Sequence, residues 1–198
     1  MNGNHYEMRF GGSGGQGMML LGDILSLAAG CLEGKEILLT KSYGPESRGG
    51  ACRSELVIDS SPINYPAVFR PDFVLAMTQL ACDQYHQDLA PGGALLLDAD
   101  LVPRPPAGQR NLYRLPLTRL ARESTGKAIT ANMLALGAIA VLGRAAGVEA
   151  VRQAVRELLP ARLLDINMIA FNAGLQAAEQ LRPAGAPAER ETARVHAA

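Results

Sequence analysis

The stretch Phe10-Gly11-Gly12-Ser13-Gly14-Gly15-Gln16-Gly17 decides the fold of this chain, because it joins a short alternating segment to a long apolar helix pattern. Residues 7–10 alternate between charged and apolar side chains, as a strand with one buried face does. From Met18 to about Cys31, apolar residues recur at helical spacing. The chain therefore begins with a predicted strand, a glycine turn and a helix.

The turn itself has the composition of a phosphate cradle. Residues Gly12 to Gly17 fit the pattern G-x-G-x-x-G, in which the missing Cβ atoms allow a tight turn and bring backbone N–H groups close to an anion. The helix that follows adds its unpaired N-terminal donors and the positive end of its dipole. Glycine turns also serve simple chain reversal, so a purely structural turn is the alternative.

The rest of the chain alternates between predicted strands and helices. Strands are expected at residues 37–39, 52–58, 72–77, 94–98 and 112–115, and helices at 80–89, 117–124, 127–146, 148–159 and 163–181. This order predicts an α/β fold, a three-layer Rossmann-like domain whose mostly parallel sheet of about five or six strands is flanked by helices, with a helical C-terminal third. The domain is expected to span residues 1–182. Residues 183–198 carry too little apolar bulk to pack and are predicted to form a disordered tail.

Composition narrows the classes of function. Among 198 residues, 19 basic ones balance 19 acidic ones, which offers no broad positive field for nucleic acid. No segment approaches the roughly 20 apolar residues of a membrane span, and the polar start lacks a signal-peptide core, so we expect no membrane association and a cytoplasmic location. Three cysteines without a C-x-x-C pair and three scattered histidines predict no metal site in this chain.

A second unusual segment, Lys41-Ser42-Tyr43-Gly44-Pro45-Glu46-Ser47-Arg48-Gly49-Gly50, follows the second predicted strand. It is expected to emerge at the same carboxyl edge as the glycine turn, where open α/β sheets bind ligands. Its two cations, aromatic ring, two serine hydroxyls and three glycines suit the binding of a charged, flat ligand. The alternative is a rigid surface turn with Arg48 in a salt bridge.

The end of the second strand bears on the identity of that ligand. A dinucleotide fold for NAD carries an acidic residue about 20 residues past the glycines, where it binds the ribose hydroxyls. Here Thr40-Lys41-Ser42 stands in that place, so plain NAD is disfavoured and an extra ribose phosphate, as in NADP or coenzyme A, is favoured. Asp98 and Asp100 end the fifth predicted strand and either face the same crevice or form a turn.

Four segments carry a family resemblance. The stronger two are Arg9 to Gly17 and the highly specific string Ser42 to Gly50. The weaker two are Ala76-Met77-Thr78-Gln79, with Asp83 and Tyr85, and Ala131 to Ala138. With these segments the chain resembles the gamma subunits of 2-oxoacid:ferredoxin oxidoreductases, most of all the 2-oxoglutarate (KorC-type) branch.

The resemblance implies a supporting subunit of an assembly that oxidatively decarboxylates a 2-oxoacid, passes electrons to ferredoxin and releases an acyl-coenzyme A. It implies that coenzyme A binds in part to this chain. Thiamine diphosphate, magnesium and iron–sulfur clusters are expected on partner alpha and beta subunits, or on a delta or ferredoxin-like subunit. The residues agree, because the chain has neither a cysteine set for a cluster nor a G-D-G-type thiamine diphosphate motif. Members that use 2-oxoglutarate, branched-chain and aryl 2-oxoacids share these motifs, so the 2-oxoacid stays open.

The resemblance also suggests roles for individual residues. The backbone of the glycine turn is assigned to the coenzyme A pyrophosphate, through Gly12, Gly14, Gly15 and Gly17. Lys41 and Ser42 are expected to reach a phosphate or the pantetheine arm. No catalytic residue is expected in this chain alone, so the isolated chain is predicted to be inactive.

Three further residues keep two interpretations each. Tyr43 belongs to the coenzyme site or, with Arg48, faces a neighbouring subunit, where Arg48 would steady a substrate carboxylate. Asn132, an amide in an apolar helix, contacts the ligand or makes a hydrogen bond between subunits. Two rival functions remain for the whole chain, a scaffold subunit that binds no ligand and an NADP-dependent oxidoreductase domain.

Overall fold

The structure of the protein is a computed structural model, which describes residues 5–43, 51–65 and 67–181. The predicted tail and the string from Gly44 to Gly50 lie outside the described residues. The strands are β1 (Tyr6–Ser13), β2 (Glu36–Ser42), β3 (Ala51–Asp59), β4 (Phe73–Ala76), β5 (Ala94–Asp98) and β6 (Asn111–Leu115). The α-helices are α1 (Met18–Ser26), α2 (Gln79–Tyr85), α3 (Leu117–Thr125), α4 (Ala131–Leu142), α5 (Val148–Leu158) and α6 (Ala161–Glu179).

One sheet in the order β2-β3-β1-β4-β5-β6 organises the fold. β1, β4, β5 and β6 run parallel to one another, whereas β3 lies antiparallel to both β1 and β2. The prediction of a mostly parallel α/β sheet is confirmed. The strand order could not be predicted from the hydrophobic periodicity, and in it β3 separates β2 from β1. At the usual strand spacing, β2 therefore lies about 10 Å from β1 instead of beside it.

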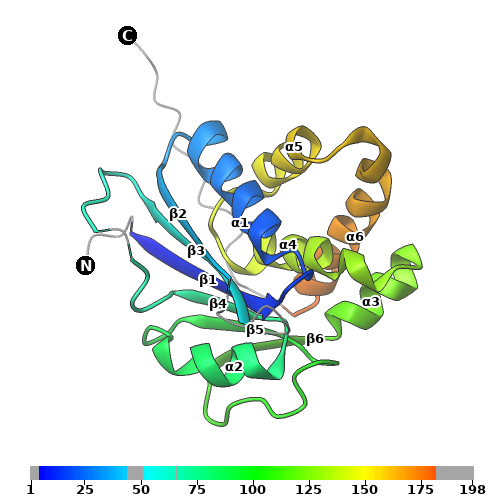
Figure 1. The fold of residues 1–198 in the computed structure, drawn as a ribbon, viewed down its shortest axis with the longest axis horizontal. Helices are drawn as coiled ribbons and strands as arrows, with labels where there is room; N and C mark the ends of the chain where they lie inside the picture. Colours follow the sequence, from blue (N-terminus) through cyan, green and yellow to red (C-terminus); the bar gives the residue numbers. More distant parts are fainter. Residues whose placement is uncertain (1–4, 44–50, 66, 182–198) are drawn as a thin grey trace.

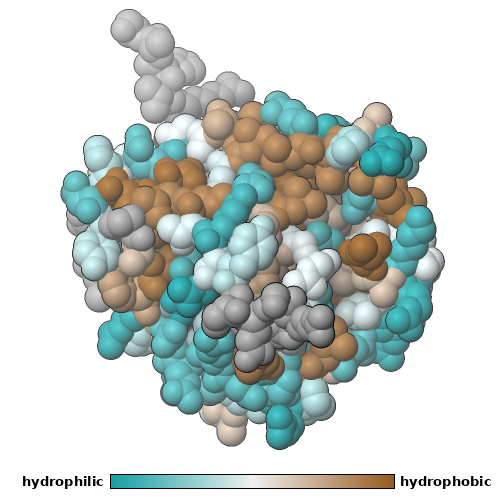
Figure 2. All heavy atoms as spheres, in the orientation of Figure 1, coloured by the Kyte–Doolittle hydropathy of each residue, from teal (hydrophilic) through white to brown (hydrophobic). Residues whose placement is uncertain are grey.

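Helices flank both faces of the sheet, as expected for three layers (Figure 1). α2 packs on β1 and β4 from one face, while α1 packs on β1, β2 and β3 from the other. α4, α5 and α6 lie on the same side as α1 (Figure 1), and the main core fills the space between these helices and the sheet. Figure 2 shows apolar atoms gathered over the upper part of this face, where α1 and α5 lie in Figure 1.

Two glycines allow α4 and α6 to touch at their backbones. A Cβ built on Gly137 would lie 2.0 Å from the carbonyl oxygen of Phe171, and one on Gly174 would lie 1.9 Å from that of Leu134. α4 is buried along its whole length except at Leu142, which fits its nearly uninterrupted apolar sequence. This close crossing fixes the position of α4, and with it the first turn of α4 at the carboxyl edge of the sheet.

Three predicted helices are α-helical over a shorter range than expected. The helix predicted at 80–89 is α-helical only to Tyr85 and continues as a 3₁₀ turn, His86–Asp88. The helix predicted at 127–146 is preceded by a 3₁₀ turn, Ala128–Thr130, and its α-helical part ends at Leu142. Thr130 accounts for the 3₁₀ turn, since its hydroxyl donates to the Lys127 carbonyl at 2.8 Å and competes with helical hydrogen bonding. The helix after the glycine turn changes from α-helix to a π-helical turn over Leu27–Leu32.

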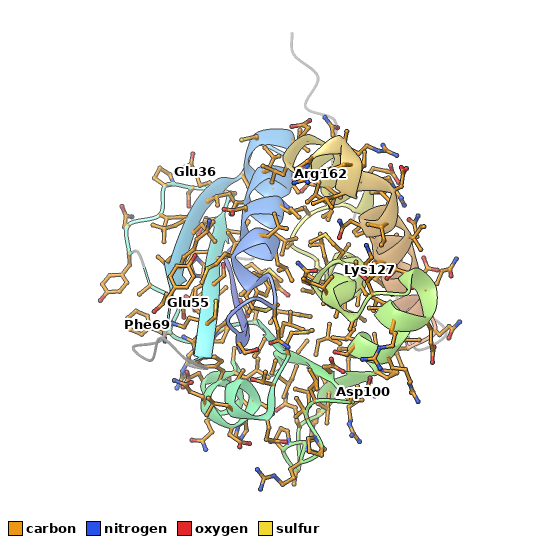
Figure 3. The ribbon with its side chains drawn as sticks, turned by 45° about the vertical axis from the view of Figure 1, so that its right-hand side comes forward. Glu36, Glu55, Phe69, Asp100, Lys127 and Arg162 are labelled. Atoms are coloured by element: carbon orange, nitrogen blue, oxygen red, sulfur yellow. The ribbon has the colours of Figure 1, made fainter. Side chains whose placement is uncertain are left out.

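The α2 face of β1 holds a buried ion-pair network centred on Arg9, which is 5% exposed. Its Nε donates to Glu55 Oε1 of β3 at 2.6 Å, and its Nη2 donates to the Val68 carbonyl at 2.8 Å. Its Nη1 donates to Asp88, and the guanidinium lies 5.2 Å from the centre of the Tyr85 ring. Glu55 lies on the sheet in Figure 3. The network joins β1, β3 and the chain around β4 and α2.

Candidate ligand-binding site

The glycine turn closes on itself through Gln16. The Ser13 N–H donates to Gln16 Oε1 at 2.7 Å, and the Gln16 N–H donates to the Ser13 carbonyl at 3.2 Å. The Gln16 side chain also donates to the carbonyl of Met77, directly after β4, at 3.4 Å. A Cβ on Gly12 would lie 2.7 Å from Gln16 Oε1, so this closure requires glycine at position 12.

The turn presents unpaired backbone donors at the start of α1. Gly15 and Gly17 have φ values of 86° and 76°, in the left-handed region that glycine adopts without strain. The first hydrogen bond of α1 runs from the Leu21 N–H to the Gly17 carbonyl at 3.1 Å. Among the described residues, the N–H groups of Gly14, Gly15 and Gly17 have no hydrogen-bond acceptor. These donors and the N-terminus of α1 together suit an anionic group.

Asn132 meets this turn from the first turn of α4. It is 8% exposed, and a Cβ on Gly17 would lie 2.1 Å from Asn132 Nδ2, so the amide rests directly on the Cα of Gly17. Its Oδ1 accepts a hydrogen bond from the Met133 N–H at 2.9 Å. Within the described part of the chain, Nδ2 has no acceptor. A nearly buried amide with an unpaired donor suits contact with a polar ligand.

A pocket of about 250 Å³ lies between the glycine turn, the end of β4 and the first turn of α4. Its polar wall includes Gly15, Gln16 and Asn132, and its apolar wall includes Met77 and Ile129. The pocket lies at the carboxyl ends of the parallel strands, where open α/β sheets bind ligands. None of the described residues that line it is charged. Its wall therefore offers N–H donors and apolar surface to a ligand, and its size admits only part of a coenzyme.

Lys41 lies at the expected edge but faces α1. β1 and β2 both run antiparallel to β3 and end at the same edge of the sheet, as predicted. Lys41 Nζ lies 2.5 Å from Asp23 Oδ1 of α1, and Lys41 does not line the pocket. The assignment of Lys41 to the ribose position of a dinucleotide fold presupposes that β2 adjoins β1. In the structure β3 lies between them, which places Lys41 farther from the turn.

The other predicted residues of the second segment are only partly covered by the structure. Ser42 ends β2 and is exposed, and Tyr43 is 75% exposed. Neither lines the pocket. Arg48 lies outside the described residues, so its predicted contact with a partner active site stays a prediction.

Asp98 and Asp100 serve as turn and helix-capping residues. Asp98 is fully buried and accepts hydrogen bonds from the N–H of Asp100 and from both the N–H and the hydroxyl of Thr118. Burial raises the pKa of the Asp98 carboxyl, and the Thr118 hydroxyl opposes that rise. Asp100, labelled in Figure 3, accepts from the Arg119 N–H at 2.9 Å. Both carboxylates thus bind the start of α3, and of the two sequence interpretations the structure favours the turn.

Several residues of the pocket wall carried no signal in the sequence analysis. Gln16 lay at a variable position of the glycine pattern, and Met77 appeared only within a weak family string. Leu101 follows β5, Thr118 lies in the first turn of α3 and Ile129 lies in the 3₁₀ turn before α4, and no local pattern brings them together. Only the close packing of α3 and α4 against the sheet does so.

Comparison with known proteins identifies the family. Residues 7–177 match the family model described as pyruvate ferredoxin/flavodoxin oxidoreductase. The match spans most of the chain, which therefore belongs to this family. Within the described residues, no helix combines the length and apolar character that a membrane crossing requires.

Two similar proteins narrow the assignment within the family. The 2-oxoglutarate synthase subunit KorC of Methanocaldococcus jannaschii is 40% identical over 177 residues, which cover 88% of this chain and 95% of that one. The gamma subunit of a keto/oxoacid ferredoxin oxidoreductase from Geobacter sulfurreducens superposes with a TM-score of 0.82 at 39% identity, covering 89% of this chain and 97% of that one. The chain is thus a KorC-like gamma subunit of the 2-oxoacid:ferredoxin oxidoreductase class, and the resemblance is confirmed.

A third protein shows the same fold inside a longer polypeptide. The 2-oxoglutarate:ferredoxin oxidoreductase of Magnetococcus marinus, solved with 2-oxoglutarate, coenzyme A and succinyl-CoA bound, has a TM-score of 0.78 at 21% identity. The similarity covers 90% of this chain but 32% of that one. In that enzyme the fold is one part of a chain about three times as long.

Proposed function

We propose that this chain is the gamma subunit of a cytoplasmic 2-oxoglutarate:ferredoxin oxidoreductase, that it contributes to coenzyme A binding and that it supports subunit assembly. The observation that carries the proposal is the set of N–H groups in the glycine turn, beside Asn132 Nδ2, that have no acceptor among the described residues. The similarity to KorC supports 2-oxoglutarate as the substrate. The M. marinus enzyme of the same fold, solved with coenzyme A, supports the ligand.

Different groups of the site would bind different parts of coenzyme A. The N–H groups of Gly14, Gly15 and Gly17 would hold the pyrophosphate at the positive end of α1. Asn132 Nδ2 would donate to a neighbouring oxygen, and the apolar wall with Met77 and Ile129 would cover an uncharged part. When bound, coenzyme A supplies the thiol that accepts the acyl group. This chain's own residues bind and orient the coenzyme, while closure at Gly12 keeps the turn in shape.

The remaining cofactors and partners are assigned to other chains. Thiamine diphosphate, magnesium and iron–sulfur clusters would lie on alpha and beta subunits, or on a delta or ferredoxin-like subunit, and ferredoxin would accept the electrons. Tyr43 and Arg48 would face such a neighbour. Tyr43, 75% exposed, is available for that contact.

Lys41 would have to leave Asp23 to reach a coenzyme phosphate. Its side chain is 34% exposed and that of Asp23 is 39% exposed, and an ion pair with this degree of exposure is worth at most about 1 kcal/mol. A contact with a phosphate would be charge-assisted in the same way as the ion pair that it replaces. Exchange of Asp23 for a ligand phosphate is therefore energetically accessible, and Ser42 lies next to it on the same strand end.

Calorimetry on the assembled complex tests these assignments. We expect Gly17→Ala and Asn132→Ala to weaken the binding of coenzyme A. If Lys41 binds the 3′-phosphate, Lys41→Ala should weaken the binding of coenzyme A more than the binding of 3′-dephospho-coenzyme A. Asp23→Asn is the matched control, because it releases Lys41 and should preserve or strengthen binding. Unchanged affinity in the Gly17 and Asn132 variants would instead identify the chain as a scaffold without ligand contact.

The NADP-dependent alternative has a separate test. We expect no change in reduced-nicotinamide fluorescence when NADPH is mixed with the purified chain. A saturable change that is lost in Gly17→Ala would favour a nicotinamide coenzyme over coenzyme A.

A further inference from the structure

The helix that follows the glycine turn has an outward face almost without charge. From Met18 to Leu32 the sequence holds one charged residue, Asp23, and Lys41 Nζ neutralises it at 2.5 Å. Leu20, Asp23 and Leu27 are spaced by three and four residues, so they line up on one side of α1 and its π-helical extension. Both leucines are partly exposed, as is Met19 beside them. We call this surface, made by Met19, Leu20, Asp23 and Leu27, the outer face of α1.

α5 lies in the same layer, and its exposed side is charged, unlike the outer face of α1. α5 contacts α1, and it buries Val151, Ala154 and Val155 while its exposed side carries three charged residues, Glu149, Arg156 and Glu157. α1 buries a comparable apolar stripe but has leucines and methionine where α5 has charges. A helix that is apolar on every side is normally covered on every side. Figure 2 shows apolar atoms at the surface in this region.

We propose that the outer face of α1 is the contact surface for a partner subunit of the oxidoreductase, of the kind that is joined to this fold in a single chain in M. marinus. The inference rests on the proposed role of the chain as one subunit of an assembly. In the M. marinus enzyme this fold accounts for 32% of the chain, so about two thirds of that polypeptide is available to cover it. A separate gamma subunit needs a non-covalent contact with such a neighbour.

The chemistry of the face favours a permanent partner over a transient one. Permanent subunit interfaces are more apolar and less charged than transient ones. An acidic electron carrier is attracted by unpaired cations, whereas Lys41, the cation that the described residues place at this face, is already paired with Asp23. The face also begins at the ligand site, since Gly17 is the N-cap of α1. A subunit that covers α1 therefore stands beside the pocket and can complete its wall.

Cys31 provides a reporter that needs no mutation. It is exposed in the π-helical turn directly after α1, whereas the other two cysteines, Cys52 and Cys82, are buried. Burial raises the pKa of the Cys52 thiol, and it raises that of Cys82 to about 11, with a further contribution from Asp83. Both buried thiols therefore react slowly with a maleimide, and the fast phase of labelling reports on Cys31 alone.

The experiment compares maleimide labelling of the purified chain with labelling of the assembled complex. We expect Cys31 to react rapidly in the isolated chain and at least tenfold more slowly in the complex. Equal rates would overturn the proposal. Protection that rises with the concentration of the isolated chain would also overturn it, because the occupant would then be a second copy of this chain.

A substitution that adds a charge to the outer face of α1 tests the same contact independently. We expect Leu27→Lys to reduce co-purification of the partner subunits at least tenfold, while Gln153→Lys, which adds the same charge to the exposed side of α5, leaves it unchanged. Circular dichroism identifies a Leu27→Lys chain that has failed to fold, in which case Cys31 labelling of the unmodified chain decides. A complex that assembles with Cys31 unprotected refutes this inference alone. A chain that joins no partner subunit refutes the proposed function as well.

Discussion

The two ends of β1 differ in whether their polar groups are paired within the chain. At its start and middle, charged side chains are brought together and paired, with His5 near Asp59 and Arg9 buried against Glu55. At its carboxyl end, the described residues of the pocket wall include no charged side chain, and the N–H groups of Gly14, Gly15 and Gly17 have no acceptor among the described residues. The paired end holds the sheet together. The unpaired end retains its capacity to bind something else.

This difference predicts that substitutions at the two ends fail in different ways. Loss of a partner at the paired end leaves a buried, desolvated charge without an ion-pair partner, so the free energy of unfolding falls. Loss of a donor at the unpaired end removes nothing on which the folded chain depends, so ligand binding falls first. Measuring the free energy of unfolding and coenzyme A affinity on the same variants tests the distinction.

Arg9→Met should have the largest effect on stability. It leaves the Glu55 carboxylate buried, with its side chain 11% exposed and its other cation, Arg53, 3.6 Å away. Breaking a buried pair in this way costs about 3–5 kcal/mol, and the remaining contact with Arg53 places the expected loss near the lower figure. Chemical denaturation measures it.

Two controls decide whether the buried charge is the cause. Arg119→Met removes an arginine whose side chain is 62% exposed and 4.0 Å from Glu123, and it should change stability little. The double variant Arg9→Met with Glu55→Leu should recover much of the loss, because no unpaired carboxylate remains at position 55. If the double variant is less stable than Arg9→Met, the network stabilises the fold by attraction and the explanation offered here is wrong.

The paired end also shows how far sequence reasoning reaches. Alternation predicted the first strand and the glycine pattern predicted the turn, because both depend on residues adjacent in the chain. The insertion of β3 between β2 and β1 had no such signal, since the alternation in β3 is the same whichever strands lie beside it. Analogy with a dinucleotide fold therefore places Lys41 beside the glycine turn, and no pattern in the sequence predicts its ion pair with Asp23.

At the unpaired end the turn was predictable and its completion was not. Asn132 was singled out because an amide in an apolar helix needs a partner, but its contact with Gly17 depends on where α6 holds α4. That position follows from the glycine contacts between α4 and α6, which join segments far apart in the sequence. The pocket residue Thr118 is likewise positioned by the capping of α3 on Asp98.

Gly17→Ala should lower both the stability of the fold and the affinity for coenzyme A. Its φ of 76° strains any residue with a Cβ, and that atom would lie 2.1 Å from Asn132 Nδ2. We expect a loss of about 1–3 kcal/mol in the free energy of unfolding and of at least tenfold in affinity. Gly14→Ala is the matched control, because no atom lies within 4 Å of a Cβ there and its φ is not left-handed. Equal losses in the two variants would contradict this account.

Asn132→Ala should separate binding from stability. The variant removes a donor that has no acceptor in the described part of the chain, together with the Oδ1 contact to the Met133 N–H. A typical hydrogen bond contributes about 0.5–1.5 kcal/mol, so we expect coenzyme A affinity to fall roughly three- to tenfold by calorimetry, with a smaller change in unfolding. Asn111→Ala is the control, since its amide donates to the Gly92 carbonyl away from the pocket. A drop in stability with unchanged affinity would assign Asn132 to the fold instead.

The smallest expected effect is a pH dependence at the paired end. Burial opposes protonation of His5, but hydrogen bonds to Asp59 and Glu7 outweigh it and raise the His5 pKa above 6.5. Because the folded-state pKa is the higher one, the stabilisation is complete below about pH 6.5 and is lost as pH rises through the folded-state pKa. Hydrogen bonds from His5 and Ser61 lower the Asp59 pKa to about 2. The contribution of Asp59 to the stability of the fold is therefore present above about pH 4 and is lost as pH falls towards 2. Denaturation of the isolated chain between pH 6 and 8 should therefore show stability falling with pH in the natural chain and a flatter profile in His5→Gln. A profile unaffected by that substitution would mean that the exposed pair contributes nothing and that the buried Arg9 network alone holds this end of β1.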